Sequence, residues 1–235
     1  MSGHSCPYAK DCQSAAIETE DGWKIQDGRH TKFRCFSASE EVLYPSVRKA
    51  RTNNMKLVEL AAHDKLAAFK AIDENMPKKC EILRIHVGGD FKTQAYFDVW
   101  LAYATARYDV LFYAYTKSLP FWVKRLNDIP KNFLLTASRG GYKDDLISEH
   151  ALREAIVVNP ALEGHEILDV HTASVDGRVY EIDHDDYHAA TAGDSFALVL
   201  HGRQPANSAA AAGVKLLKGF GSYDKDKGAN LVLVS

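Results

Sequence analysis

The stretch that decides the fold is Cys-Glu-Ile-Leu-Arg-Ile-His-Val-Gly-Gly-Asp-Phe at residues 80–91. Residues 82–87 form a short apolar run that favours a β-strand, and Gly88-Gly89-Asp90 ends this run at a polar corner. A helix is expected directly after the corner, because Thr93 can cap its first turn and apolar side chains then recur at helical spacing. The stretch therefore predicts a strand with a glycine-bearing polar end, followed by a crossover helix.

The same pattern occurs twice more along the chain. Residues 110–117 form a second apolar run with a polar end, and a short helix capped by Ser118 is expected over 119–126. Residues 132–137 form a third run, which ends at Ser138-Arg139. Because strands joined by crossover helices run parallel, we expect the three polar ends to share one rim. Open α/β sheets and barrels bind ligands at that rim.

The remaining segments complete the predicted architecture. A first strand is expected over 31–36, followed by a long helix over about 45–72 with a break near Asn53-Asn54. The sequence Ser-Val-Asp-Gly at 174–177 indicates a hairpin insertion over 166–183. Further elements are a short helix over 146–153, strands over 155–158 and 196–200, and an alanine-rich helix that begins at Ser208 and is closed by Gly219.

Together these elements predict an α/β fold, a partial (β/α) TIM-like barrel with about six mostly parallel strands. We expect a single domain over 1–235, in which 1–34 form a cysteine-bearing loop region with a hairpin or loop excursion around Trp23. The chain shows no linker and no repeat beyond the strand-helix rhythm.

Composition limits the classes of function. With 235 residues, of which 46% are hydrophobic and 26% charged, the chain is typical of one large globular domain. A net charge of -2 gives no overall attraction to nucleic acid or to an anionic membrane. No apolar run approaches the roughly 20 residues of a membrane helix, and the N-terminus lacks the apolar core of a signal peptide. We therefore expect a protein of the reducing cytoplasm, whose cysteines are free, metal-bound or catalytic.

Cys6, Cys12 and Cys35 are the sharpest chemical feature of the sequence. Cys35 is expected at the rim end of the first strand, and the loop that carries Cys6 and Cys12 can fold over the same rim. Three thiolates at one end of a sheet suit a soft metal or an iron-sulfur cluster. Their spacing is not that of a zinc finger, and burial as small hydrophobes is the competing interpretation. Cys80 begins its strand, about 25 Å from the glycine corner at a rise of about 3.3 Å per residue, so we expect it to be structural.

Five segments of the chain, taken together, point to a known family: Cys-Pro-Tyr-Ala-Lys-Asp-Cys at 6–12, Cys-Phe at 35–36, Arg-Ile-His-Val-Gly-Gly-Asp-Phe at 84–91, Phe-Tyr-Ala-Tyr-Thr-Lys-Ser at 112–118 and His-Gly-Arg-Gln-Pro at 201–205. In these segments the sequence resembles the gene-product-88 family of bacteriophage proteins, which look like distant, shortened relatives of radical S-adenosylmethionine (SAM) enzymes. The resemblance implies a partial barrel with a 4Fe-4S cluster on Cys6, Cys12 and Cys35. It further implies that SAM can bind the iron that has no cysteine ligand.

Seven rim residues are candidates to bind such a cofactor or its ligand. In radical SAM enzymes a glycine-glycine-acid stretch after the second strand holds the amino group of SAM, and Gly88-Gly89-Asp90 resembles that motif. Lys117 and Arg139 can receive a carboxylate or a phosphate. Ser138 and His201 complete the set. The competing interpretation of each residue alone is a satisfied polar group at a strand end.

Other polar residues are expected to be structural. We expect His86 to point into the barrel and to form a local hydrogen bond rather than to bind metal. The acidic run over 183–188 is expected to form a solvated turn, and Tyr113 and Tyr115 are expected in the core. In radical SAM enzymes the three cysteines usually lie in one compact loop after the first strand, whereas two of them here precede it.

Three functions remain open at this stage. The first is an iron-sulfur protein whose open iron takes a small ligand; if the ligand is SAM, the implied chemistry is reductive cleavage to a radical. The second is a non-catalytic phage protein, in which a cluster or a zinc ion fastens the cysteine loop to the barrel and the surface binds a host or virion protein. The third is a metal-free binding domain. In each case we expect the protein in the cytoplasm of the infected host cell.

Overall fold

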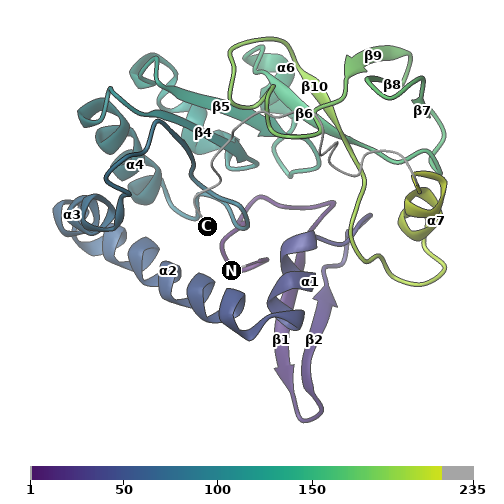
Figure 1. Ribbon diagram of the computed structural model, residues 1–235, viewed down its shortest axis with the longest axis horizontal. Helices are drawn as coiled ribbons and strands as arrows, with labels where there is room; N and C mark the ends of the chain where they lie inside the picture. Colours follow the sequence, from purple (N-terminus) through teal and green to yellow (C-terminus); the bar gives the residue numbers. More distant parts are fainter. Residues whose placement is uncertain (1, 219–235) are drawn as a thin grey trace.

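A computed structural model describes residues 2–218 of the chain. Its centre is a parallel sheet in the order β10-β6-β5-β4-β3, which curls into a half-barrel (Figure 1). The five strands of this sheet are β3 (Ile82–Arg84), β4 (Leu111–Thr116), β5 (Phe133–Ser138), β6 (Glu154–Val158) and β10 (Phe196–Val199).

The strands of this sheet are staggered. Strands β4 and β5 pair over five residues, up to Thr116 opposite Ala137, whereas β6 begins only at Glu154, which also lies opposite Ala137. The first half of β5 therefore has a strand neighbour on the β4 side only. A stagger of this kind accompanies the tilt of strands in a curved sheet.

The helices that follow β3, β4 and β5 along the chain pack against one face of the sheet through the main core. Thr93 caps α4 by accepting a hydrogen bond from the N–H of Tyr96, as the sequence predicts. Ser208 caps α7 in the same way, while the predicted stop at Gly219 lies outside the described residues. The helices are α1 (Phe36–Leu43), α2 (Pro45–His63), α3 (Lys65–Asn75), α4 (Gln94–Ala106), α5 (Leu119–Val123), the 3-10 helix η1 (Leu126–Asp128), α6 (Asp145–Glu149) and α7 (Ala209–Leu216). None of them is long and apolar enough to cross a membrane.

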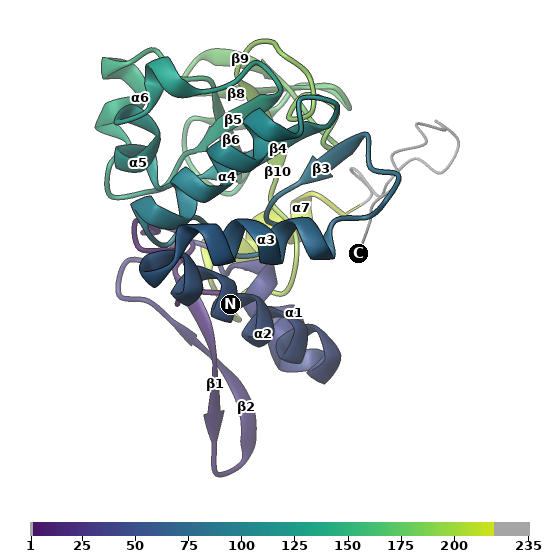
Figure 2. The same ribbon diagram turned by 90° about the vertical axis from the view of Figure 1, so that its left-hand side faces the viewer.

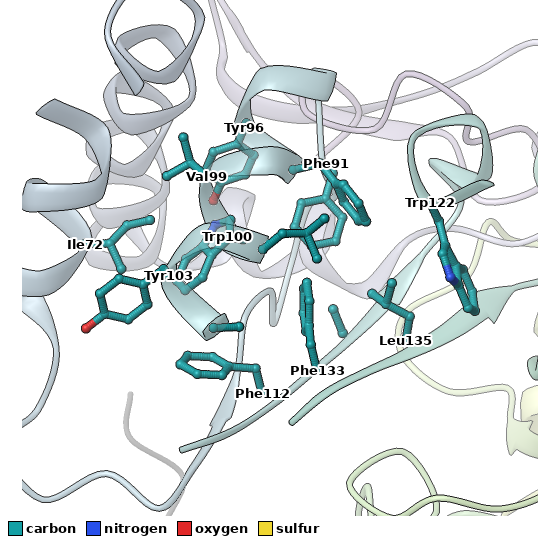
Figure 3. Close-up of a cluster of buried hydrophobic side chains, with 14 of the residues drawn as sticks. Ile72, Phe91, Tyr96, Val99, Trp100, Tyr103, Phe112, Trp122, Phe133 and Leu135 are labelled. Carbon is teal, nitrogen blue, oxygen red and sulfur yellow. The ribbon is translucent and has the colours of Figure 1, made fainter. Parts of the chain in front are cut away.

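The main core lies between α4 and the sheet, and it is strongly aromatic (Figure 3). Phe97, Tyr103 and Phe112 are completely buried. The ring of Trp100 lies 6.3 Å from that of Phe112, centroid to centroid, and 6.1 Å from that of Tyr103. Truncation of one such buried aromatic side chain typically costs about 3–5 kcal/mol. The packing of these aromatic rings fixes α4 against the sheet, and it also fixes the corner that precedes α4.

Two small antiparallel sheets flank the half-barrel. Strands β1 (Ser14–Thr19) and β2 (Gly22–Asp27) form a hairpin that projects from the body in both views (Figures 1 and 2), which confirms a hairpin around Trp23. The predicted hairpin insertion is also present, as β8 (Thr172–Val175) and β9 (Arg178–Glu181), with β7 (His165–Ile167) as a third strand. A single bridge between Ile182 and Ala197 links this sheet to β10.

The predicted first strand over 31–36 is wrong, and the parallel sheet has five strands among the described residues rather than about six. Residues 28–35 form no helix or strand, and Phe36 begins α1. The N–H groups of Lys32 and Phe33 instead donate to the carbonyl of Asp11, at 2.7 and 3.1 Å. The side chain of Arg34 pairs with Asp27 of β2. Contacts with distant residues thus replace strand pairing in this segment.

Two local predictions about helices are also wrong. Helix α2 continues through Asn53-Asn54, which are exposed, and the break comes at Asp64, whose side chain caps α3 by accepting from the N–H of Ala67. Ser118 precedes α5 without capping it, because its hydroxyl donates to the carbonyl of Phe91 at 2.6 Å. In both places a side chain has more than one potential partner, and the sequence pattern does not distinguish between them.

Asn132 ties the start of β5 to the turn between α4 and β4. Its side-chain amide donates to the carbonyls of Ala104, Arg107 and Val110 at 2.9, 3.0 and 2.9 Å. We expect Asn132→Leu to lower the free energy of unfolding by about 2 kcal/mol, because these carbonyls lose a buried donor. Asn75→Leu is the matched control, since the Asn75 amide donates to one helix carbonyl at the exposed surface. Equal urea midpoints for the two variants would contradict this assignment.

Candidate functional site

The loop that carries Cys6 and Cys12 is bound to the turn after β5. The N–H groups of Lys10 and Asp11 donate to the carbonyl of Gly140 at 3.2 and 2.9 Å. In return, the N–H of Tyr142 donates to the carbonyl of Tyr8 at 2.9 Å. The backbone of Gly140 has φ +100°, and an added Cβ would lie 3.1 Å from the Cβ of Asp11, so glycine allows this close approach. The expected folding of the loop over the rim is confirmed (Figure 1).

Cys35 is brought to the same place from the other side. It is the residue immediately before α1, and its N–H donates to the hydroxyl of Ser14 at 3.4 Å. The preceding residues run beside Cys12, because Lys32 and Phe33 donate to the carbonyl of Asp11. Cys35 therefore reaches the rim at the start of a helix and not at the end of a strand.

The three thiols share one electrostatic environment. Burial is the main cause that raises the pKa of Cys6, and the charges of Asp90, Cys35 and Cys12 raise it further. Burial and the charge of Cys12 raise the pKa of Cys35 to about 11, although the backbone amides of Ser37 and Ala38 and the charge of Lys117 lower it. Each pair among Cys6, Cys12 and Cys35 interacts electrostatically, so the three thiols lie within electrostatic range of one another. They repel one another as thiolates, and a cation among them would relieve that repulsion.

Within residues 2–218, no group of three or more His, Cys, Asp and Glu side chains is placed so that it could hold a metal ion.

Cys80 takes no part in this group. Its side chain is buried in the main hydrophobic core, and its sulfur contacts the carbonyl of Ile82 at 3.5 Å. The expectation that Cys80 is structural is confirmed.

Gly88 brings the polar corner against the first turn of α1. A Cβ added at Gly88 would lie 2.1 Å from Oγ of Ser37 and 3.0 Å from Cζ of Arg51. The backbone of the corner therefore touches the helix that begins beside Cys35. Glycine is required here by the lack of space.

Asp90 fastens the corner to the end of β4. Its Oδ1 accepts from the N–H of Phe91 at 2.7 Å and from the hydroxyl of Thr116 at 2.6 Å, and its Oδ2 accepts from the N–H of Lys117 at 2.8 Å. Burial raises the pKa of Asp90 to about 6, although these three donors and the charge of Lys117 lower it. Oδ2 retains an acceptor position for one further donor.

The ammonium group of Lys117 is fixed by three oxygen atoms. It donates to the carbonyl and hydroxyl of Ser138 at 2.8 and 2.7 Å and to the carbonyl of Arg139 at 2.9 Å. None of these acceptors is a carboxylate, and the charge of Lys117 acts on both Asp90 and Cys35. Lys117 thus lies within electrostatic range of the polar corner and of one of the three thiols.

Arg139 and His201 lie at the edges of this group. The guanidinium of Arg139 pairs with Glu154 at 2.6 Å. The ring of His201 stacks on Phe36, with centroids 5.4 Å apart, and its side chain is exposed. His86 forms the expected local hydrogen bond, to the hydroxyl of Tyr96 at 3.2 Å, but it packs against α4 rather than inside the barrel.

One polar cluster on the sheet was not predicted. The carboxylate of Asp186 accepts from Arg84 at 2.5 Å and from the hydroxyls of Tyr115 and Tyr113 at 2.9 and 3.2 Å. The expectation of a wholly solvated turn over 183–188 is therefore wrong. Tyr113 and Tyr115 are two residues apart on β4, so the alternation of side chains along a strand places them on the same face. Thr116 lies on the opposite face. Nothing in the sequence indicates that Asp186 lies opposite them.

Comparison with known proteins gives one match. The sequence model of a family described as "Gene product 88" matches residues 1–216. No curated protein and no solved structure matches the chain.

Substitution of Gly88 tests the contact between the corner and α1. We expect Gly88→Ala to lower the free energy of unfolding by about 1–3 kcal/mol, because the new methyl group overpacks a filled space. Ser37→Ala in the same chain should recover part of this loss, since it removes the hydroxyl that the methyl group meets first. That hydroxyl has no hydrogen-bond partner among the described residues, so its removal alone should cost little. Gly193→Ala, at a position with open space, is the control. Additive effects of the two substitutions in urea unfolding would contradict the contact.

Proposed function

The chain belongs to the gene product 88 family of phage proteins, and we propose that Cys6, Cys12 and Cys35 hold a 4Fe-4S cluster in it. The observation that supports this proposal most is the electrostatic coupling of three thiols that reach the rim from two separate segments. As neutral thiols these side chains need no counter-charge, whereas a metal centre among them would stabilise their thiolate forms.

The residues around the thiols suit a negatively charged cluster. Lys117 places a positive charge beside Cys35, and the amides of Ser37 and Ala38 favour the thiolate of Cys35. Hydrogen bonds and charges of this kind set the stability and the reduction potential of a cluster. The fastened loop at Gly140 would keep Cys6 and Cys12 in place while a cluster is bound.

We further propose that this site binds a small ligand beside the cluster, with SAM as the ligand to which the resemblance points. A cluster with three cysteine ligands supplies one iron that a ligand can bind, and electrons for reductive cleavage. Oδ2 of Asp90 can accept a hydrogen bond from an amino group, and it lies in the electrostatic range of Cys6. Lys117 is held too firmly by Ser138 and Arg139 to move toward a carboxylate.

The alternative is a structural cluster in a non-catalytic protein that binds a host or virion protein. The internal hydrogen bonds of the rim residues favour this alternative. Asp90 accepts three hydrogen bonds and Lys117 donates three within the chain. Asp90 and Lys117 therefore have few free acceptor or donor positions left for hydrogen bonds to a substrate. In this alternative the cluster staples the N-terminal loop to the half-barrel.

The ligand assignment is tested by replacing each cysteine with alanine and purifying the protein anaerobically. We expect the wild-type chain and Cys80→Ala to contain iron and acid-labile sulfide and to show a broad visible absorption that reduction bleaches. Cys6→Ala, Cys12→Ala and Cys35→Ala should each lose most of the iron. A colourless wild-type protein with one zinc ion per chain would refute the cluster. Retention of iron by all three variants would refute the ligand set.

Electron paramagnetic resonance of the reduced protein separates the two roles of the cluster. If SAM binds the open iron, its addition should change the signal of the reduced cluster, because the ligand field at that iron changes. Asp90→Asn should weaken this response, since an amide oxygen accepts more weakly than a carboxylate. An unchanged signal at saturating SAM would reject the ligand proposal and leave the structural alternative.

A further inference from the structure

Two cavities lie beside β5: the first half of the strand lines one of them, and Arg139, directly after the strand, lines the other. The stagger of the sheet creates this place, because β6 begins only opposite Ala137. Arg153 and Gly193 line both cavities, so the two are adjacent, and we refer to them together as the cleft. The cleft shares no lining residue with the cysteine loop.

The first cavity is mainly apolar and has a volume of about 290 Å³. Trp122 of α5 and Leu135 of β5 are buried core residues, labelled on the right-hand side of Figure 3, and both line this cavity. Its remaining apolar walls are Leu126, Ile129, Phe133 and Leu134. A flat or extended apolar group suits these walls.

The second cavity has a volume of about 410 Å³ and is polar. Three arginines line it, Arg139, Arg153 and Arg178, against the two carboxylates of Glu154 and Asp194. Glu154 is already paired with Arg139. Arg178 is exposed, and its guanidinium lies over the ring of Tyr180 at 4.9 Å. The cavity therefore has an excess of positive charge.

Arg153, at the junction, is a half-buried cation without a carboxylate partner among the described residues. Its guanidinium donates to the carbonyls of His188, Thr191 and Ala189 and to the hydroxyl of Thr136. These neutral acceptors occupy the N–H groups of both terminal nitrogens, and the carboxylate of Asp183 acts on the charge from a greater distance. A buried charge of this kind is costly unless an opposite charge approaches it.

We propose that this cleft binds a small molecule with an apolar body and a single anionic group. The apolar body lies against Trp122 and Leu135, and the anion pairs with the exposed Arg178, with the charge of Arg153 nearby. The two volumes together fall within the range of about 300–1,000 Å³ that is typical of small-molecule sites. Arg139 lines the second cavity and its carbonyl accepts from Lys117, so this cavity borders the candidate site, but none of the three cysteines lines it.

The test uses 1-anilinonaphthalene-8-sulfonate, an aromatic anion whose fluorescence rises in apolar surroundings, titrated into the folded full-length chain. We expect saturable binding of one probe per chain, weakened about tenfold by Arg178→Gln, which removes a charge-assisted contact. Gly193→Leu should abolish binding. An added Cβ at Gly193 meets no atom within 4 Å, so the leucine can fill the junction without a clash at its base. Urea unfolding should show that both variants keep the stability of the wild type.

Two control substitutions and two competitors complete the experiment. Arg203→Gln removes an exposed arginine elsewhere, and Ala50→Leu adds a leucine to an exposed helical position; both should bind the probe like the wild type. Decanoate and decyl phosphate should displace the probe, and their relative affinities identify the preferred anion, whereas decanol should displace it poorly. Absence of saturable binding would overturn the proposal, as would equal binding by Gly193→Leu or equal displacement by decanol.

Discussion

The constraint on which the site depends is the attachment of the cysteine loop to the turn after β5. Two N–H groups of the loop share the carbonyl of Gly140, and Tyr142 returns a hydrogen bond to Tyr8. These are backbone contacts, so they fix the path of the loop without specifying its side chains. The path carries Cys6 and Cys12 to the rim, and the carbonyl of Asp11 brings the segment before Cys35 beside them.

The stagger of the parallel sheet accounts for two separate regions of chemical interest. At one end, the polar corner after β3 and the ends of β4 and β5 gather Asp90, Lys117 and Ser138 around the thiols. At the other end, the late start of β6 leaves the first half of β5 open on one side, and Arg153 with Gly193 lines the space. A sheet of flush strands would have neither a curled rim nor this cleft. The geometry of one element thus explains both features.

A structural element or contact could be predicted from the sequence where its interacting residues lie close together along the chain. Strands β4 and β5, the cap at Thr93 and the hairpin of β8 and β9 follow from residues within a few positions of each other, and all are confirmed. The strand expected over 31–36 failed because Lys32 and Arg34 have partners in other segments. The contact of Asp186 with Tyr115 spans 71 residues and has no local signal. The rim residues of the site were predictable because strand ends of a parallel sheet must meet, whereas the attachment at Gly140 was not.

The central claim is that three thiols at the rim hold a four-iron cluster, and the mass of the intact chain tests it most directly. Native mass spectrometry of anaerobically purified protein should give the mass of the polypeptide plus four irons and four sulfides, and denaturation should release the difference. The mass of the bare polypeptide after reconstitution with iron and sulfide, or a mass that exceeds it by one metal ion, would contradict the account.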